Sequence, residues 1–478
     1  MCALAVVGII ALGAADRGWI ERRVAGRPLH GFESTGAQLD LAGYLSELSG
    51  APFGIADTRQ GLVGPVRTFY ERRGWEPVWI VDGRPRTDAL PLLHFLGEIE
   101  GEGLVQADFQ LAPLAAALSA AGRGSVDARP EEIEVGLTWA ALLAAAQMRH
   151  GRTTPQDLPG RWEMQRAPVD LAAVLEEGLR SADLTAYLRG LAPTHPQFAA
   201  LLDAYRRARS ELATETQAEL RAPIEERLQQ LRLNLDRWRW VPDDFGSRAV
   251  VVNIPGFTLD VEEQGRVTMS MRTVVGEVES PTPVFAGRIR SLVVNPYWNV
   301  PPNILAREVL PALQADPSYL ASHDMEVVRA AGADLPAVAA SELWAPTAGG
   351  EVRVRQRPGP RNPLGKVKFM FPNEHDVYLH DTTATALFAR SARARSHGCV
   401  RLERPLELAE LLLHDDPRWR AGALDAAVAS GEERHIPLRE SVPVFLVYMT
   451  AAAQPDGAVA FYDDVYGLDR AHQAAWVR

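Results

Sequence analysis

The stretch "RAVVVNIPGFTLDVEEQGRVTMSMRTVVG", residues 248–276, decides the fold class, because the periodicity of the chain changes here from helix to strand. It contains three runs rich in β-branched residues, at 249–254, 257–262 and 266–275. The pairs Pro255-Gly256 and Gln264-Gly265 separate these runs, and both are typical of turns. The stretch therefore predicts three consecutive strands joined by short turns.

Before this stretch the chain is helical. Between residues 40 and 205, apolar residues recur at three- and four-residue spacing in segments such as "VGLTWAALLAAAQMRHG", and loops with Gly and Pro separate the segments. This pattern predicts an all-helical domain over 40–205. The highly charged residues 206–242 also have helical periodicity, and we expect them to form either a connector to the strands or a packed helix pair.

After this stretch the pattern stays β-rich as far as residue 452. Further strands are predicted in "RIRSLVVNPYW", "KVKFMFP", "HDVYLHD" and "VPVFLVYMTA". Residues 303–344 are instead helical and loop-like, which predicts an insertion of the kind that covers a site as a lid. The sequence thus predicts a multidomain α+β protein, with a helical domain followed by a β-rich domain over 243–452 that holds this insertion. The last residues, 453–478, are expected to form a tail packed on the β-rich domain.

The composition is that of an ordinary globular protein. The chain has 478 residues, of which 47% are hydrophobic and 23% are charged, so two or three packed domains are expected. Its formal net charge of −11 leaves no general basic surface for a phosphate backbone, which argues against nucleic-acid binding. The basic residues are nearly all Arg, with Lys366 and Lys368 as the only lysines, and we interpret this bias as a property of coding rather than of function.

The first 15 residues, "MCALAVVGIIALGAA", form an unbroken apolar run that is followed at once by charged residues. Fifteen residues are few for a bilayer span, which needs about 20, but they fit the apolar core of a signal peptide that ends in the small residues Gly13, Ala14 and Ala15. The run is therefore expected to direct export, either as a cleaved signal peptide or as an uncleaved membrane anchor. A buried core helix is the remaining alternative.

A second short stretch, "SHGCVRLE" at 396–403, holds one of only two cysteines in the chain. Cys399 loses its only potential partner if the segment that contains Cys2 is removed, and an unpaired cysteine in an exported protein indicates a reactive thiol or an intermolecular bridge. Two histidines could take the thiol proton: His397, two residues earlier, and His380, at the end of a predicted strand that could pair with this segment. Cys399 is thus a candidate nucleophile, and an inert buried thiol is the alternative.

The residues around Cys399 fit this chemistry. The following "LELAELLL" is strongly helical, so we expect the thiol to lie in the turn before a helix, whose N-terminus favours a thiolate. Backbone N–H groups in such a turn can bind an oxyanion, Gly398 permits close backbone approach, and Arg401 adds a positive charge. A metal site is an alternative, although its spacing differs from that of the strong zinc signatures, and its ligands would be His375, His380, His397 and Cys399.

Together, "YLHDT" and "SHGCVR", with 15 residues between His380 and Ser396, resemble the H-x(n)-[ST]-H-G-C-x-R signature of the L,D-transpeptidase (YkuD-type) catalytic domain. Other stretches, among them "VVNPYWNVPPNI" and "GPRNPLGKVKFMFPN", resemble the larger YcbB-type members of that family, so the resemblance covers about 230 to 450. The segment "RGWEPVWIVDGRPRTDALPLLHFLGEIEGEGLVQADF" resembles their N-terminal scaffold domain. Between the two, the chain leaves no room for the small peptidoglycan-binding module that YcbB-type members usually carry.

The resemblance implies an activity and a role for each matching residue. Cys399 would attack the amide between meso-diaminopimelate and D-Ala in a tetrapeptide stem of peptidoglycan and form a thioester. His380 would take the thiol proton and pass protons while an acceptor amine resolves the thioester into a 3→3 cross-link. His397, Gly398 and the N–H of Cys399 would shape the oxyanion site. No metal or organic cofactor is needed, and the supporting residues would be Ser396, Asp381 and Arg401. The alternatives are a side chain that points away for Asp381 and a structural role for Arg401.

The resemblance also implies a location and a set of partners. The enzyme would act in the periplasm on stem peptides, as donor tetrapeptide and acceptor amine, with membrane contact only through its N-terminal segment, and carbapenems would inhibit it covalently. The 303–344 insertion would be a lid that holds the donor stem. Trp298 and Tyr378 are expected to pack in the interior, with a place along the substrate groove as the alternative. The same nucleophile would also suit an L,D-carboxypeptidase or an enzyme that anchors proteins to the wall, and a catalytically silent wall scaffold is a third alternative.

Overall fold

The computed structural model divides into two compact units. The helical unit comprises the described residues up to Pro159, Met164–Asp244 and those from Thr450 onward, and the sheet unit comprises Gly160–Glu163 and Phe245–Met449. Each unit has its own buried core, as expected for a chain of this length. The residues that the structure describes are 39–48, 50–56, 61–81, 84–86, 89–122, 129–160, 162–329, 337–338, 352–420 and 422–477.

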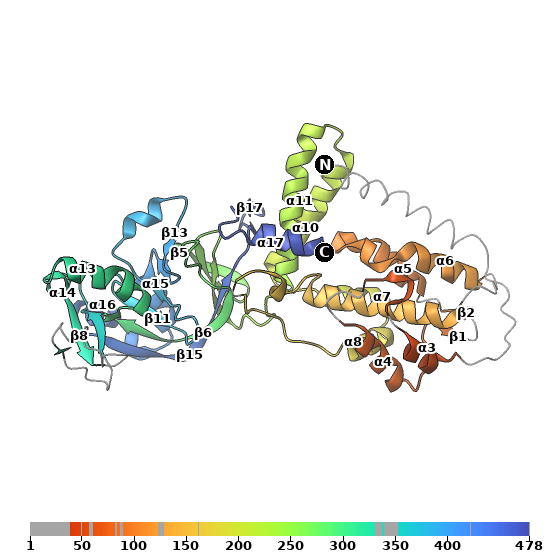
Figure 1. Ribbon diagram of the computed structural model, residues 1–478, viewed down its shortest axis with the longest axis horizontal. Coiled ribbons are helices and arrows are strands. Elements are labelled where there is room, and N and C mark those ends of the chain that lie inside the picture. Colours follow the sequence, from red (N-terminus) through yellow and green to blue (C-terminus); the bar gives the residue numbers. More distant parts are fainter. Residues whose placement is uncertain are drawn as a thin grey trace. The chain divides into compact units, whose positions relative to one another are not determined.

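The helical unit is built around α7 (Pro130–His150), a 21-residue helix that is buried throughout from Ile133 to Met148. Its many small Ala residues let neighbouring helices approach closely on all sides (Figure 1). The helices packed against it are α3 (Leu41–Glu47), α4 (Val63–Arg72), α5 (Ala89–Gly97), α6 (Leu111–Gly122), α8 (Leu171–Arg180) and α9 (Leu184–Arg189). Short turns of 3-10 helix join them at η1 (Pro52–Gly54), η2 (Ile99–Glu102), η3 (Gln106–Phe109) and η4 (Pro155–Asp157). The predicted helical domain is confirmed, apart from a small hairpin of β1 (Ile80–Val81) and β2 (Arg84–Pro85).

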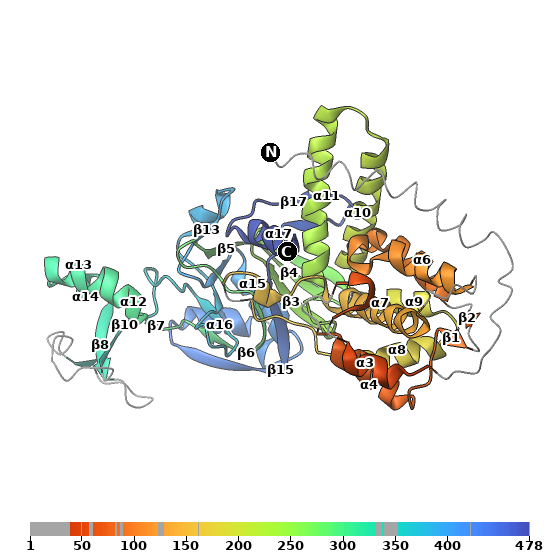
Figure 2. The ribbon, with the colours of Figure 1, turned by 45° about the vertical axis from the view of Figure 1, so that its right-hand side comes forward.

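Two long helices follow, α10 (Pro196–Thr214) and α11 (Ala218–Trp238), and they pack against each other as a hairpin (Figure 2). Of the two alternatives for residues 206–242, the packed helix pair is therefore confirmed. The pair begins at Pro196 rather than at 206, because proline suits the first turn of a helix and the side chain of His195 caps it by accepting from the N–H of Gln197.

The C-terminal segment packs on this helix pair. It forms a hairpin of β16 (Ala451–Ala453) and β17 (Val459–Phe461), followed by α17 (Leu468–Trp476). Gln230 of α11 donates to two carbonyl oxygens of this segment at 2.9 and 3.0 Å, and buried His472 of α17 contacts the carboxylate of Asp236 at 3.0 Å. The prediction that 453–478 packs on the β-rich domain is wrong, because the tail belongs to the helical unit, where α11 and Gln197 of α10 supply polar partners.

A nine-stranded sheet with the order β13-β5-β14-β12-β11-β6-β15-β3-β4 organises the sheet unit. The long strand β5 also pairs with β4, so the strands from β5 to β4 form a closed ring of pairings. The strands predicted over 248–276 are confirmed as β3, β4 and β5, and the later predicted stretches contribute β6, β11, β12 and β15. The strands are β3 (Arg248–Asn253), β4 (Thr258–Glu263), β5 (Arg266–Gly276), β6 (Phe285–Val294), β11 (Val367–Met370), β12 (Leu379–His380), β13 (Ala394–Ser396), β14 (Val400–Leu402) and β15 (Arg434–Val447).

The core of the sheet unit follows from the period-2 alternation of its strands. Val250, Val252, Leu259 and Val261 of β3 and β4 point inward and are fully buried, as expected when every second residue of a strand faces the core. The helices α15 (Pro405–Leu413) and α16 (Ala423–Ala429) contribute Leu, Ala and Val side chains to the same core. This core holds β11, β12 and β14 in register, and the candidate residues lie on these strands and beside them.

The insertion is larger than predicted and has a sheet of its own, with the order β7-β10-β8-β9. It contains β7 (Trp298–Asn299), α12 (Pro302–Ile304), a π-helical turn (Leu305–Val309), α13 (Leu310–Ala315), α14 (Tyr319–Ser322), β8 (Met325–Arg329), β9 (Ala337–Val338) and β10 (Val352–Gln356). The prediction of a helical and loop-like 303–344 is thus corrected, because these strands are too short to show a clear period of two. Trp298 packs against the insertion's own small core, as expected.

Two predictions fall wholly or partly outside the described residues. The signal peptide or anchor at 1–15 lies outside them, as do 330–336 and 339–344 of the insertion. Within the described part of the chain, no helix combines the length and the apolar character that a membrane span requires.

Candidate active site

The candidate active site lies where β12 and β14 run side by side in parallel. Leu379 pairs with Val400 and His380 pairs with Arg401, which places Cys399 opposite the residue before Leu379. Since side chains alternate along a strand, Leu379 and Val400 point into the core, and His380, Arg401 and Cys399 share the other face. The strand of His380 and the segment of Cys399, whose pairing the sequence left open, do pair in the structure.

Two further residues complete the surroundings of the thiol. The sulfur of Cys399 donates to the carbonyl oxygen of Asp376 at 3.7 Å, and Tyr378, opposite Cys399, lowers the pKa of the thiol through its side chain and its backbone amide. Lys368 of β11 pairs in register with His380, and its Nζ lies 3.6 Å from the centroid of the Tyr378 ring. Tyr378 is half-buried and packs against the core of the sheet unit, as expected, and it also lies near the thiol. Lys368 was missed because both lysines were set aside as a coding bias.

The contacts of His380 fix its tautomer. Its Nδ1 lies 2.5 Å from the carbonyl oxygen of Asp381, which can only accept, so Nδ1 carries the proton and Nε2 keeps its lone pair. Burial, together with the positive charges of Arg401 and Lys368, lowers the pKa of His380 to about 3. The imidazole is therefore neutral and able to act as a base.

Asp381 holds this arrangement through its backbone. Its carboxylate accepts the N–H groups of Lys366 and Thr382, each at 2.7 Å. Gly365 is required beside it, because a Cβ atom there would lie 2.3 Å from the Asp381 carboxylate, and its φ of +59° also favours glycine. Asp381 thus anchors the turn before β11 with its side chain and orients His380 with its carbonyl.

The thiol of Cys399 is neutral in the resting protein. Burial raises its pKa, although the contacts from Tyr378 and the charges of Lys368 and Arg401 oppose this shift. The expected helix effect is absent here, because Cys399 is followed by β14 and α15 begins only at Pro405, beyond the reach of a helix N-terminus. The prediction of a thiol in the turn before a helix, poised as a thiolate, is therefore corrected to a neutral thiol on the same face of the paired strands as a neutral imidazole.

This pairing of neutral groups predicts a particular pH profile. In the Cys2→Ala variant, which leaves Cys399 as the single cysteine, alkylation by iodoacetamide is expected to keep rising above the ordinary cysteine pKa of about 8.5. The reason is that iodoacetamide reacts with the thiolate, which forms only above the raised pKa of Cys399. The measurement is the second-order alkylation rate from pH 4 to 11. A plateau between pH 4 and 8, as a thiolate–imidazolium pair would give, contradicts the account.

The loop before Cys399 is held by two hydroxyl groups. Ser396 donates to the carbonyl oxygen of Cys399 at 2.5 Å and accepts from the N–H of Gly398 at 3.2 Å. Buried Thr282 donates to the carbonyl oxygen of Gly398 at 2.8 Å and accepts from the N–H of Gly276 at 2.9 Å. Gly398 has a φ of +114°, which residues with a side chain rarely adopt.

These bonds orient the amide of Cys399. Its N–H belongs to the same planar peptide as the Gly398 carbonyl and points the opposite way, away from Thr282. Among the described residues, no acceptor for this N–H is seen. The amide of Cys399 is therefore a candidate oxyanion donor, and Thr282 positions it. Thr282 lies 117 positions before Cys399 in a turn without a distinctive motif, so the sequence offers no signal for it.

Thr282→Val is expected to slow acylation of Cys399 by at least about tenfold, because the Gly398 peptide loses the bond that holds it. Two lost buried hydrogen bonds should also lower the free energy of unfolding by about 1–3 kcal/mol. Thr268→Val is the matched control, because Thr268 bonds to Val261 in the β4–β5 pair. Single-turnover acylation and denaturant unfolding measure the two effects, and equal acylation rates in both variants contradict the role of Thr282.

Lys368→Met is expected to slow acylation about tenfold or more, because its ammonium group no longer stabilises the charge that develops on the sulfur of Cys399. Lys366→Met is the matched control, since Lys366 is the other lysine and is exposed. Single-turnover acylation and the alkylation profile measure the effect. A Lys368→Met protein with the same thiol pKa as the control rules out an electrostatic role.

The remaining predicted residues lie around this centre. His397 is 45% exposed, and its Nε2 lies 3.3 Å from the carboxylate of Glu308 in the insertion. Arg401 is half-buried, and its Nε has no hydrogen-bond partner among the described residues. His375 pairs instead with Glu163 at 3.0 Å. The proposed metal ligands thus face different partners, and no group of three His, Cys, Asp or Glu in the described chain is arranged to hold a metal ion.

Two protein families match parts of this chain. Residues 247–419 match the L,D-transpeptidase catalytic domain, and residues 64–204 match the Scaffold domain. The first match covers β5, β11, β12 and β14 with Cys399 and His380, and the second covers most of the helices around α7.

One curated relative and two solved structures are similar to parts of the chain. The relative, "Putative L,D-transpeptidase" from Haemophilus influenzae, is 35% identical over 51% of this chain and 48% of its own length, so the chain spans about half of that protein. An L,D-transpeptidase from Mycobacterium smegmatis is 12% identical over 42% of this chain and 58% of that one, with a TM-score of 0.19. L,D-transpeptidase 3 from Mycobacterium tuberculosis, in complex with a faropenem-derived adduct, is 15% identical over 42% and 60%, with a TM-score of 0.20.

Proposed function

Because this chain carries an L,D-transpeptidase catalytic domain behind a scaffold domain, we propose that it is a peptidoglycan L,D-transpeptidase with Cys399 as nucleophile and His380 as general base. The observation that carries the proposal is the pairing of β12 with β14, which puts both side chains on one face of the matched domain. The neutral state of His380 and its Nδ1 contact supply the base that a neutral thiol requires.

The first half of the reaction forms a thioester. The sulfur of Cys399 attacks the carbonyl carbon between diaminopimelate and D-Ala of a donor tetrapeptide, while its proton moves to Nε2 of His380. The N–H of Cys399 donates to the oxyanion that forms, and Lys368 and Arg401 add positive charge beside it. The C–N bond then breaks, the His380 proton passes to the amine of D-Ala, and the acyl group stays on sulfur.

The second half resolves the thioester. The side-chain amine of an acceptor stem attacks the thioester carbon, and its proton moves to His380. The C–S bond breaks and the sulfur regains its proton from the imidazole, so the product is a 3→3 cross-linked dimer. Water in place of the amine would give a tripeptide, which is the L,D-carboxypeptidase alternative, and an amine of a protein would give the wall-anchoring alternative.

The enzyme would meet its substrate in the periplasm, and the segment 1–15 would be the signal that directs its export. The apolar run and the peptidoglycan substrate both support this location, and a carbapenem is expected to acylate Cys399 in place of the stem. Fractionation of cells that express the full chain tests the location, and enzyme recovered in the cytosol contradicts it.

Product analysis tests the activity. Purified protein is incubated with disaccharide-tetrapeptide, and products are separated and analysed by tandem mass spectrometry. A dimer that has lost one D-Ala and is joined between two diaminopimelate residues supports the proposal. Formation of the tripeptide alone favours the carboxypeptidase, and no product with the wild-type protein favours a silent scaffold.

A further inference from the structure

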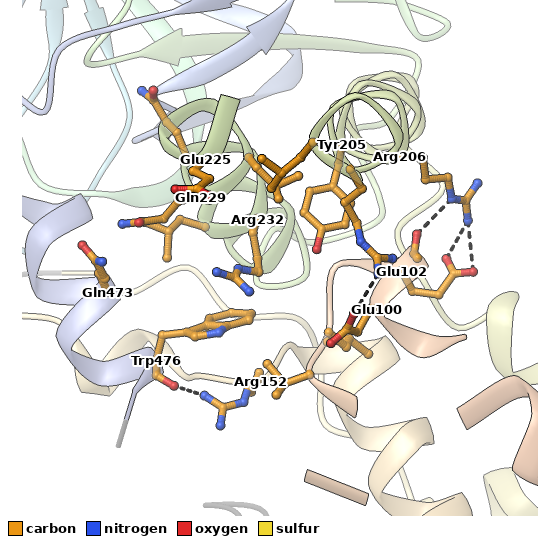
Figure 3. A pocket seen from close by; sticks show the side chains of 18 of the residues that line it. Glu100, Glu102, Arg152, Tyr205, Arg206, Glu225, Gln229, Arg232, Gln473 and Trp476 are labelled. Carbon is orange, nitrogen blue, oxygen red and sulfur yellow. Dashed lines mark hydrogen bonds and ion pairs between the residues drawn. The ribbon is translucent and has the colours of Figure 1, made fainter. Parts of the chain in front are cut away.

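The helical unit contains a large cavity of about 2010 Å³ whose lining residues all belong to that unit (Figure 3). Its walls are the segment 97–107 with η2 and η3, the facing sides of α10 and α11, and the C-terminal segment with α17. Sites for small molecules usually measure about 300–1,000 Å³, so this cavity has room for an oligopeptide or a glycopeptide. Cys399 lies in the sheet unit and is not among the lining residues.

Ion pairs join the segments that form the wall of this cavity. Arg206 donates to both oxygens of Glu102 at 3.0 Å, and Arg209 pairs with Glu100 at 2.7 Å. Arg152 pairs with the carboxylate of Asp108 at 2.8 Å and also bonds to the carbonyl oxygen of Trp476. Each of these guanidinium groups is already paired with a carboxylate. They therefore shape the cavity wall, and little of their positive charge remains available to a ligand.

Arg232 and Tyr205 also line the cavity, but their polar groups have no such partner among the described residues. No hydrogen bond or ion pair joins Arg232 to any described residue, its Nε is buried, and its guanidinium lies 5.4 Å from the centre of the Trp476 ring. Tyr205 is 2% exposed, and its hydroxyl has no hydrogen-bond partner in the described chain. Both side chains project into the cavity from neighbouring helices (Figure 3). Because burial raises the pKa of Tyr205, its hydroxyl keeps its proton and can donate.

The surrounding residues narrow the ligand class. Burying an unpaired guanidinium in a partly desolvated cavity costs free energy unless an anion binds to it. A carboxylate suits this role, because its two oxygens can accept two N–H groups of the guanidinium. Gln229 and Gln473 also line the cavity and offer amide groups suited to peptide bonds. Glu226 and Asp463 in the same lining would repel a polyanion, which excludes a phosphate backbone.

We propose that this cavity is a second, non-catalytic binding site for a peptide, whose C-terminal carboxylate is bound by Arg232 and Tyr205. The choice of a peptidoglycan stem peptide as its natural ligand rests on the proposed function. The site would hold a strand of the wall at the helical unit while the sheet unit acts on another stem, so the protein would bind its polymeric substrate at two places.

Calorimetric titration tests this site. The full chain with Cys399→Ala, which cannot turn over the probe, is titrated with a stem tetrapeptide that has either a free or an amidated C-terminus. We expect two binding events for the free acid, of which one weakens at least tenfold for the amide. Arg232→Gln and Tyr205→Phe should each weaken the same event at least tenfold. Arg227→Gln is the matched control, because Arg227 lies on the same helix but outside the cavity.

The outcomes distinguish a failure of the proposed second binding site from a failure of the proposed catalytic activity. Loss of the event in Arg232→Gln and Tyr205→Phe, with retained thermal unfolding temperature and normal thioester formation when Cys399 is present, supports the second site. Equal binding of the acid and the amide, or equal binding by Arg232→Gln and Arg227→Gln, overturns it. If the proposed activity is wrong, thioester formation is absent in every protein, while binding that depends on Arg232 is unaffected.

Discussion

Cys399→Ala is expected to lower the rate of cross-link formation on the order of 10⁴-fold or more, to the level of the reaction without enzyme. The reason is that the variant lacks the atom to which the acyl group is transferred, and no neighbouring group can replace it. Ser396 is the nearest hydroxyl in the loop, but it already donates to the carbonyl oxygen of Cys399 and is buried. Initial rates of dimer formation from disaccharide-tetrapeptide, followed by mass spectrometry, measure the effect.

Cys2→Ala is the control for this experiment, because it removes the other cysteine of the chain. We expect it to retain the wild-type rate. The thermal unfolding temperature of Cys399→Ala should stay close to that of the wild type, since a half-buried thiol is replaced by a smaller apolar group. Dimer formation by Cys399→Ala at more than a trace of the wild-type rate would show that another residue is the nucleophile.

His380→Gln is expected to slow acylation of Cys399 by about 10²–10⁴-fold, which is the usual contribution of a general base. Glutamine fills a similar space and can still donate to the carbonyl oxygen of Asp381, but it cannot accept the thiol proton at neutral pH. The deficit should shrink at high pH, where the thiol of Cys399 ionises without help. Single-turnover acylation between pH 6 and 11 measures both effects.

His397→Gln separates this role from that of the adjacent histidine. His397 is only two residues from Cys399, but its imidazole faces the carboxylate of Glu308. Its replacement is therefore expected to slow acylation less than about tenfold. If His397→Gln is the slower variant, or if the deficit of His380→Gln does not depend on pH, the base has been assigned to the wrong residue.

Local patterns in the sequence predicted the parts of the site that depend on local structure. The alternation in 248–276 predicted β3, β4 and β5. The strand signal around His380 predicted β12, whose pairing with β14 puts His380 and Cys399 on one face. Long-range contacts were not predictable in this way. Thr282 reaches Gly398 through the folding of the sheet unit, and Lys368 lies beside Tyr378 because β11 pairs with β12.

The expectation for the thiolate failed for a physical reason that a sequence does not show. The helical pattern after Cys399 is real, but three residues of strand and a turn separate α15 from the thiol, and a helix N-terminus acts only within about one turn. Burial then outweighs the nearby charges and raises the pKa of Cys399. Burial depends on the packed fold, so the resting protonation state follows from the structure and not from the motif.

The most direct test of the central claim is the detection of the covalent intermediate. The wild-type protein is mixed with disaccharide-tetrapeptide, quenched in acid within the first turnover, digested and analysed by tandem mass spectrometry. We predict that a disaccharide-tripeptide acyl group is attached to the peptide that contains Cys399, and that one free D-Ala is released for each adduct. An acyl group on any other residue, or unmodified Cys399 while cross-linked dimer accumulates, would contradict the account.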